Sequence, residues 1–142
     1  MKNELFFSLL PIKTDRLIIR KTSINDINLI MKMDKQEITQ MFLGGIKNKT
    51  REERIRFLEK KNNSLTVYLK NNKSIGFIDL KIDKENKQCE LSYIFDYDYS
   101  KLGHCTEACK KLINIVFNIL DIDTIYALTI CDNISSKRVL EN

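Results

Sequence analysis

The chain has 142 residues, of which 43% are hydrophobic and 30% charged, and its formal net charge is +5. This length fits one domain of common size, so we expect a single domain over residues 1–142. The basic residues are scattered and interrupted by acidic ones. That pattern disfavours nucleic-acid binding, which prefers a one-sided basic stripe.

The N-terminal apolar run, residues 5–10, is too short for a secretory signal and has no small-residue cleavage site. No other segment approaches the roughly 20 apolar residues that span a bilayer. We therefore expect a cytoplasmic protein that has no membrane partner.

The four cysteines, Cys89, Cys105, Cys109 and Cys131, include no C-x-x-C pair. A disulfide framework is typical of short, loop-rich chains, so buried structural thiols are the default interpretation. Cys105 and Cys109 are one helical turn apart beside His104, which leaves a metal site as an alternative. We expect no metal, because no second ligand pair occurs at metal-site spacing.

The first half of the chain predicts one strand followed by two helices. Apolar residues flanked by arginines indicate a strand over residues 14–22. Ser23, followed by Asp26 three residues later, forms a variant of the capping box that starts a helix. Thr50 and Glu53 form a second capping box, which predicts another helix.

The middle of the chain switches to strand patterns. Predicted strands over residues 65–70, 75–82 and 88–95 are joined by short polar turns, which require an antiparallel meander. A loop then leads to a helix over about residues 104–120. Its apolar stripe is predicted to comprise Cys105, Ala108, Cys109, Leu112, Ile115, Val116 and Ile119.

The last segments are a strand over residues 124–131 and a partial helix over residues 133–142. The strand follows a helix, so we expect it to be parallel to the third meander strand. The order β-α-α-β-β-β-α-β-α defines an α/β (α+β) fold, in which helices flank a mixed, mostly antiparallel sheet.

Gly103 lies between a polar, aromatic-rich loop and the helix that begins at residue 104. Backbone N–H groups at such a junction are unpaired, and with the positive end of the helix dipole they can bind phosphate or another anion. One glycine before a helix is also an ordinary turn, so both interpretations stay open from this feature alone. The strand–loop–helix–strand unit would place the anion site at the carboxyl end of the sheet.

Four segments together are typical of one family: Thr14–Arg20, Ser74–Ile78, Glu90–Phe95 with Tyr99–Ala108, and Asn133–Asn142. In their order and spacing the chain resembles the GNAT superfamily of acetyl-CoA-dependent N-acetyltransferases. The branch it resembles most is that of the ribosomal-protein N-acetyltransferases (RimJ/RimL-like). The likeness covers nearly the whole chain and implies a GNAT-like fold.

The family's pyrophosphate loop has the pattern Arg/Gln-x-x-Gly-x-Gly/Ala. Its positions here are Ser100, Gly103 and Cys105, and only Gly103 matches. The phosphate contacts come mainly from backbone N–H groups, so the departures are tolerable in principle. The resemblance implies acetyl-CoA contacts from Leu102, Gly103, His104, Cys105 and Thr106. The alternative for Ser100 and Cys105 is a turn residue and a core thiol.

The resemblance also implies a mechanism in which a primary amine attacks the thioester while the enzyme holds both reactants. The pantetheine arm would pair with the backbone near Ile94 and Phe95, and a backbone N–H would stabilise the oxyanion. Glu90 is the candidate base, its alternative being a surface carboxylate. We assign His104, the only histidine, to the loop or the cofactor edge rather than to the base.

Asn133 resembles the family asparagine that hydrogen-bonds the pantetheine arm, and Arg138 would lie near the CoA phosphates. Their alternatives are a helix cap and a solvated charge. Family members normally continue with at least one more strand and commonly a tyrosine acid. We therefore expect a C-terminally truncated domain without an assignable general acid. Its last strand would have an exposed edge that invites pairing into a homodimer.

Three functional hypotheses follow. The first is an active N-acetyltransferase that uses acetyl-CoA as cosubstrate and a small-molecule or peptide amine as acceptor. The second is a truncated or degenerate relative that binds CoA without turnover, and the third is a small basic interaction module. We favour the first. The region over residues 35–62 is expected to line the acceptor side.

Overall fold

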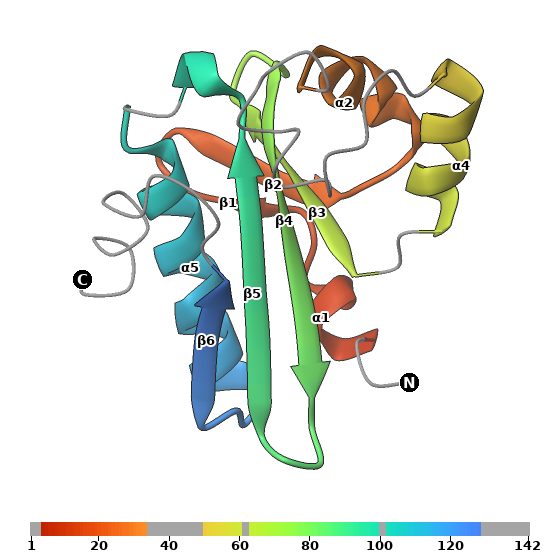
Figure 1. The fold of residues 1–142 in the computed structure, drawn as a ribbon. Helices are drawn as coiled ribbons and strands as arrows, with labels where there is room; N and C mark the ends of the chain where they lie inside the picture. Colours follow the sequence, from red (N-terminus) through yellow and green to blue (C-terminus); the bar gives the residue numbers. More distant parts are fainter. Residues whose placement is uncertain (1–3, 34–49, 61–62, 100–101, 129–142) are drawn as a thin grey trace.

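The computed structural model describes residues 4–33, 50–60, 63–99 and 102–128. The elements in chain order are α1 (Glu4–Ser8), β1 (Ile12–Lys13), β2 (Leu17–Lys21), the 3-10 turn η1 (Ile24–Asp26), α2 (Ile27–Met33), α4 (Arg51–Lys60), β3 (Ser64–Leu69), β4 (Ser74–Asp83), β5 (Gln88–Phe95), the 3-10 turn η2 (Tyr97–Tyr99), α5 (His104–Ile119) and β6 (Thr124–Leu128). In this described part of the chain, the strands form one six-stranded sheet in sequence order, β1 to β6. The helices lie on both faces of that sheet (Figure 1).

The sheet is mixed. Neighbouring strands are antiparallel from β1 to β5, and β5 pairs with β6 in parallel. The parallel pair is joined by α5, as a crossover between parallel strands requires. The predicted α/β (α+β) fold with a mostly antiparallel sheet is confirmed, and so is the parallel last strand. The predicted helix over residues 133–142 lies outside the described residues.

Both predicted capping boxes are present. The Ser23 N–H donates to the Asp26 carboxylate at 2.9 Å, and the Ser23 hydroxyl accepts from the Asn25 N–H at 3.2 Å. At the start of α4, the Thr50 N–H donates to Glu53 Oε1 and the Glu53 N–H donates to Thr50 Oγ1, both at 3.1 Å. These side chains satisfy backbone donors that the helices themselves leave unpaired.

The core has two parts, one on each face of the sheet. The larger part packs α5 and Phe6 of α1 against one face, and the smaller part packs α2 and α4 against the other. Side chains of β5 alternate between them, because successive strand residues point to opposite faces. Leu91 and Phe95 enter the larger part, whereas Ile94 enters the smaller part with Phe77 of β4.

Two sequence predictions need correction: the start of one strand, and the absence of a helix near the N-terminus. The strand predicted over residues 14–22 begins only at Leu17, because Thr14 closes a turn: its N–H donates to the Leu17 carbonyl and its hydroxyl accepts from the Leu17 N–H, both at 3.0 Å. Residues 5–10 were given no element, yet α1 forms there and buries Phe6.

The predicted apolar stripe of α5 also needs a correction. Ile119 is 47% exposed, and Leu120, one residue beyond the helix, takes the buried position that follows Leu112 and Val116 at helical spacing. Cys105 is only half-buried, whereas Cys89 and Cys109 are buried free thiols. Cys131 lies outside the described residues. In the described ranges, no helix has both the length and the apolar character needed to cross a bilayer.

Candidate functional site

The start of α5 is open to solvent and is not capped by a side chain. Gly103 occupies the N-cap with φ +81°, a left-handed conformation that favours glycine, and no side-chain hydrogen bond caps the helix. The first helical bond is donated by the Glu107 N–H to the Gly103 carbonyl at 3.0 Å. The N–H groups of His104, Cys105 and Thr106 precede that bond, so the helix supplies them with no acceptor. A helix start of this kind is suited to binding an anion.

The end of β5 lies at the same end of the sheet as the start of α5, because α5 runs back alongside β5 (Figure 1). In the described residues, β6 is in register with β5 only as far as Ser92, and Ile94 and Phe95 pair with β4. The ring of Phe95 lies over Gly76 of β4, where an added Cβ would be 2.6 Å from the ring. The structure therefore brings Ile94 and Phe95 to the sheet end from which the loop to α5 departs.

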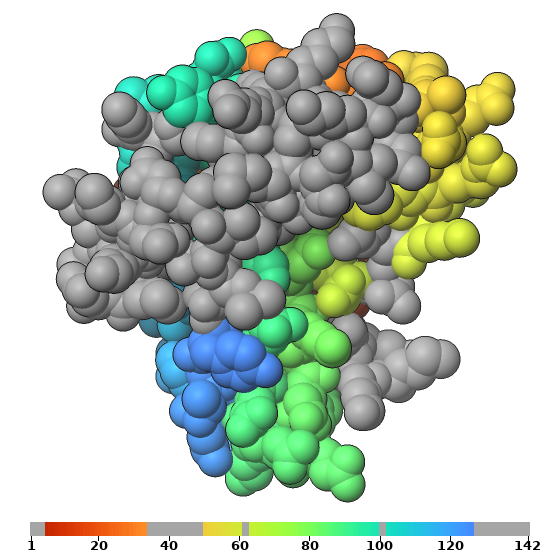
Figure 2. Space-filling model, in the orientation of Figure 1, coloured from red at the N-terminus to blue at the C-terminus, as the bar shows by residue number. Residues whose placement is uncertain are grey.

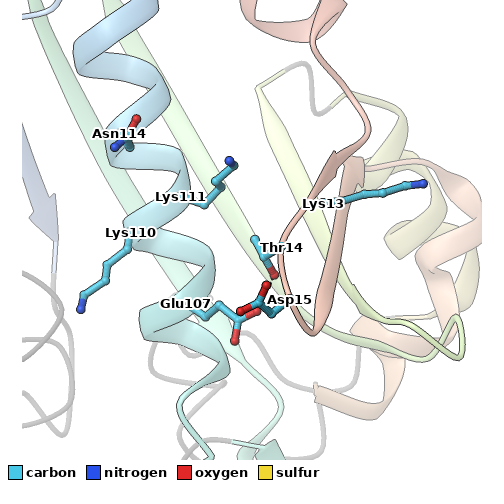
Figure 3. Close-up of a pocket in the computed structure, with 7 residues that line it drawn as sticks. All are labelled: Lys13, Thr14, Asp15, Glu107, Lys110, Lys111 and Asn114. Carbon is cyan, nitrogen blue, oxygen red and sulfur yellow. The ribbon is translucent and has the colours of Figure 1, made fainter.

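Arg16, in the turn between β1 and β2, holds the start of α5. Its Nε donates to Glu107 Oε1 at 2.6 Å, its backbone N–H donates to Glu107 Oε2 at 2.9 Å, and its Nη1 donates to the Leu102 carbonyl at 3.0 Å. The Thr14 hydroxyl also donates to Glu107 Oε2, at 2.5 Å. Figure 3 shows Thr14 and Glu107 directed toward one another across the gap between the turn and the helix.

These contacts set the charge of Glu107. Burial acts to raise the pKa of its carboxyl group, but hydrogen bonds from Thr14 and Arg16, together with the Arg16 charge, outweigh burial and lower that pKa below the ordinary value of 4.5. Glu107 is therefore ionised at neutral pH. It accepts one hydrogen bond from the guanidinium of Arg16, which is always charged, and a second from the Arg16 backbone N–H.

The side chain of His104 turns away from solvent. It is 7% exposed and packs edge-on against Tyr99, with ring centroids 6.0 Å apart. Burial and the nearby Arg16 charge lower the pKa of its imidazole below 6.5. A neutral, packed imidazole offers no cation to the loop, so the group that His104 presents at the helix start is its backbone N–H.

Glu90 is not brought to the start of α5. It is half-buried on β5, in register with Lys81 and Tyr126. Glu90 shares a face with Ile94 but precedes it by four residues, which is about 13 Å along a strand. It is therefore nearer the β4–β5 turn, which together with β6 lies at the opposite end of the molecule from η2 (Figure 2).

A groove of about 660 Å³ lies between the β1–β2 turn and α5. It is lined by Lys13, Thr14, Asp15, Glu107, Lys110, Lys111 and Asn114. The side chains of Lys13 and Lys110 point away from it in opposite directions (Figure 3). Its charged groups therefore do not converge on one ligand position. No group of three or more His, Cys, Asp or Glu in the described ranges is arranged to hold a metal ion.

Sequence reasoning placed Arg16 and Thr14 in a strand and gave neither a role, and it gave Glu107 none. An acidic residue in the first turn of a helix is a recognisable signal, but it is normally explained by the helix dipole alone. Its partner Arg16 is 91 residues away in the sequence, so the pairing could not be read from spacing. Ser100, Asn133 and Arg138 lie outside the described residues.

A second ion pair links α2 to the segment after β5. Lys32 Nζ donates to Asp96 at 2.6 Å and to Asp98 at 3.1 Å. Asp96 is buried, and its backbone N–H donates to the Ile75 carbonyl at 2.8 Å. This pair fixes the path that the chain takes as it leaves the end of β5.

The comparisons with known proteins agree with this geometry. The model of the acetyltransferase (GNAT) domain matches residues 16–142, so the chain belongs to the GNAT acetyltransferase family. No curated protein sequence matches the chain at a significant level.

Solved structures share the fold. A GNAT-family acetyltransferase from Bacillus anthracis superposes with a TM-score of 0.80 at 23% identity, over 92% of this chain and 80% of its own. The microcin C7 self-immunity acetyltransferase MccE, in complex with acetyl-CoA and AMP, gives 0.76 at 18% identity, over 90% of this chain and 77% of its own. The spermidine N-acetyltransferase from Vibrio cholerae, in complex with CoA and spermine, gives 0.73 at 16% identity, over 90% and 79%.

Proposed function

We propose that this chain is an N-acetyltransferase that moves an acetyl group from acetyl-CoA to a primary amine. The observation that carries the proposal is the uncapped start of α5, with Gly103 in a left-handed conformation, at the sheet end where β5 terminates. Membership of the GNAT acetyltransferase family supports the reaction class.

The residues at this end of the sheet fit the cosubstrate. We assign its diphosphate to the backbone N–H groups around Gly103 in the segment Leu102–Thr106, because a left-handed glycine followed by a helix start presents several donors in one direction. We assign its pantetheine arm to the backbone of Ile94 and Phe95, as an added strand. Asn133 and Arg138 remain the proposed further contacts to the arm and the phosphates.

The reaction needs little covalent help from the protein. The amine nitrogen bonds to the acetyl carbon, the carbon–sulfur bond breaks, and the products are an amide and the CoA thiol. Holding both reactants in place supplies much of the acceleration, and a backbone N–H at the end of β5 stabilises the oxyanion. The amine must lose a proton, and we propose that Glu90 takes it. Glu90 shares a face of β5 with Ile94 but lies about 13 Å from it along the strand, so the proton would travel along a chain of water molecules.

The acceptor is proposed to be a small-molecule or peptide amine. The resemblance to the RimJ/RimL-like branch puts a peptide N-terminus among the candidate acceptors, beside a polyamine and an aminoglycoside. Two of the compared proteins differ in this respect, since one is described as a spermidine N-acetyltransferase and another as a self-immunity enzyme.

The proposal is tested by incubating the protein with acetyl-CoA and a panel of amines that includes a peptide N-terminus, spermidine and an aminoglycoside. We expect free CoA thiol to appear in step with one acetylated amine, and Glu90→Gln to reduce kcat while leaving CoA affinity unchanged. Binding of CoA in a calorimeter without turnover of any amine would favour the degenerate relative instead. Absence of CoA binding would refute the proposal.

A further inference from the structure

One arginine connects the β1–β2 turn to the segment that leads into α5. The Arg16 side chain reaches two separate partners, the Glu107 carboxylate within the helix and the Leu102 carbonyl just before it. We propose that Arg16 is a positioning residue for the diphosphate of the acyl donor. It orients the Leu102–Gly103 peptide and offsets the negative charge of Glu107. This inference rests on the proposed function.

The orienting role follows from the geometry of the peptide bond. The Leu102–Gly103 peptide is planar and trans, so its carbonyl and the Gly103 N–H point in opposite directions. Arg16 Nη1 binds that carbonyl at 3.0 Å and thereby directs the Gly103 N–H away from itself. Gly103 has no side chain to fix this peptide locally, so the fixing comes from a distant residue.

The neutralising role follows from the place of Glu107 in the helix. Glu107 is in the first turn of α5, where an ionised carboxylate repels any bound diphosphate. Arg16 Nε lies 2.6 Å from that carboxylate, so the two charges offset each other. Removal of Arg16 would leave Glu107 with the Thr14 hydroxyl as its remaining side-chain donor and with a charge that opposes the ligand.

The same arginine also stands beside the glycine. Arg16 Nη2 is 3.4 Å from the point that a Cβ at residue 103 would occupy. Within the described residues, this amino group donates no hydrogen bond. The guanidinium therefore lies beside the open helix start while it is bound to the Glu107 carboxylate and the Leu102 carbonyl. From this position its fixed positive charge attracts an anion bound at the helix start.

Arg20, on the strand β2 that follows the Arg16 turn, provides a matched control. Its guanidinium lies over the Tyr68 ring, 5.0 Å from the centroid, and Nη2 donates to the Asn72 side chain at 3.3 Å. Arg20 has the same charge and is likewise exposed, but none of the contacts it makes within the described residues reaches α5. Arg20→Gln removes one positive charge without touching the helix start, so it separates a general charge effect from the role proposed for Arg16.

The test compares ligands with and without the diphosphate. CoA and pantetheine are titrated into wild type, Arg16→Gln, Arg16→Lys and Arg20→Gln in a calorimeter, and kcat and KM are measured with acetyl-CoA and S-acetylpantetheine. We expect Arg16→Gln to weaken CoA binding about tenfold and to leave pantetheine binding unchanged. The loss should appear in KM for acetyl-CoA rather than in kcat, and Arg20→Gln should behave as wild type.

Two further variants sharpen the result. Arg16→Lys keeps the charge without the forked geometry, so we expect it to recover part of the lost affinity. The double variant Arg16→Gln with Glu107→Gln should also bind CoA more tightly than Arg16→Gln alone, because the repelling carboxylate is gone. If Arg16→Gln fails to fold, as judged by circular dichroism, the Arg16→Lys measurement decides.

Equal losses for CoA and pantetheine, or wild-type CoA affinity in both Arg16 variants, would overturn the inference while leaving the proposed function intact. If wild type itself binds no CoA, the proposed function fails and the inference falls with it. These two failures are distinguished by the wild-type titration alone.

Discussion

The helix starts on the two sides of the sheet are built in opposite ways. Before α2 and α4, the chain closes each start with its own side chains, through Ser23 with Asp26 and Thr50 with Glu53. At α5 the start carries a glycine and no side-chain cap. The comparison shows that the uncapped start of α5 is set by its local sequence, since two other starts in the described residues are capped by side chains.

The carboxylates at these starts also differ in their surroundings. Asp26 is buried and accepts hydrogen bonds from the Ser23 N–H, the Thr66 hydroxyl and the Tyr68 hydroxyl, and burial raises the pKa of its carboxyl group. Glu107 is more exposed and paired with Arg16, and its pKa is lowered. One carboxylate stabilises a closed start, and the other anchors an open one.

The largest effect is expected at the closed start. Asp26→Ala leaves three donors without their acceptor in a buried site, so we expect it to lower the free energy of unfolding by about 3 kcal/mol, measured by urea denaturation. Because this network is remote from α5, CoA affinity should be unchanged at temperatures where the variant is folded. A tenfold change in CoA affinity would show that the two starts are coupled.

Substitution of Gly103 should affect both stability and ligand binding. A side chain at φ +81° costs about 1–2 kcal/mol, and a Cβ would lie 3.4 Å from Arg16 Nη2. We therefore expect Gly103→Ala to lower the free energy of unfolding by that amount and to weaken CoA binding in calorimetry. Gly103→Asn is the matched control, because asparagine tolerates this conformation better and should be less destabilising. Equal stability of wild type and Gly103→Ala would contradict the assigned backbone geometry.

A smaller effect is expected at the start of α4. Thr50→Ala removes the side-chain acceptor for the Glu53 N–H, which should cost about 1 kcal/mol in urea denaturation. Thr50→Ser keeps the hydroxyl and should restore most of that loss. A neutral Thr50→Ala would mean that water replaces the cap at no cost.

The smallest effects are the pH dependences, which should have opposite signs. The pKa of Glu107 is lowered in the folded chain, so its ionised form stabilises the fold above the ordinary value of 4.5, and this contribution is lost as pH falls through the folded-state pKa. The pKa of Asp26 is raised, so its contribution declines as pH rises from 3.8 through the folded-state pKa. Urea denaturation of Glu107→Gln and Asp26→Asn against wild type, over about pH 3 to 7, measures both slopes. Slopes of the same sign would contradict this contrast.

Much of the fold could be predicted because its signals are local. The capping boxes, the three meander strands and the glycine before α5 each occupy a few adjacent residues, and the structure confirms them. The bounds of β5 were predicted correctly because polar turns and loops flank an alternating run. The helix α1 was missed because five residues are too few to show a helical period, and α1 buries Phe6 in the core.

The sequence predicted the backbone part of the candidate site, but not the side-chain contacts that hold it. Gly103 identified the helix start, since a left-handed glycine has a recognisable place in the sequence. The Arg16–Glu107 pair was not predictable, because nothing in either segment specifies the other. The exposure of Ile119 was missed for a related reason. Helical spacing predicts an apolar stripe, but which residue is the last to be buried depends on how far α5 packs along the sheet.

The pair between Arg16 and Glu107 joins residues 91 positions apart in the chain. The open helix start is therefore assembled only when both halves of the domain have folded together, and a ligand bound there is linked by mass action to the folded state. With the proposed function, an acyl donor at a hundredfold excess over its dissociation constant would add about 2.7 kcal/mol of stability. A simple melting-temperature screen of thioester carriers would thus report ligand recognition for this chain before any acceptor amine is known.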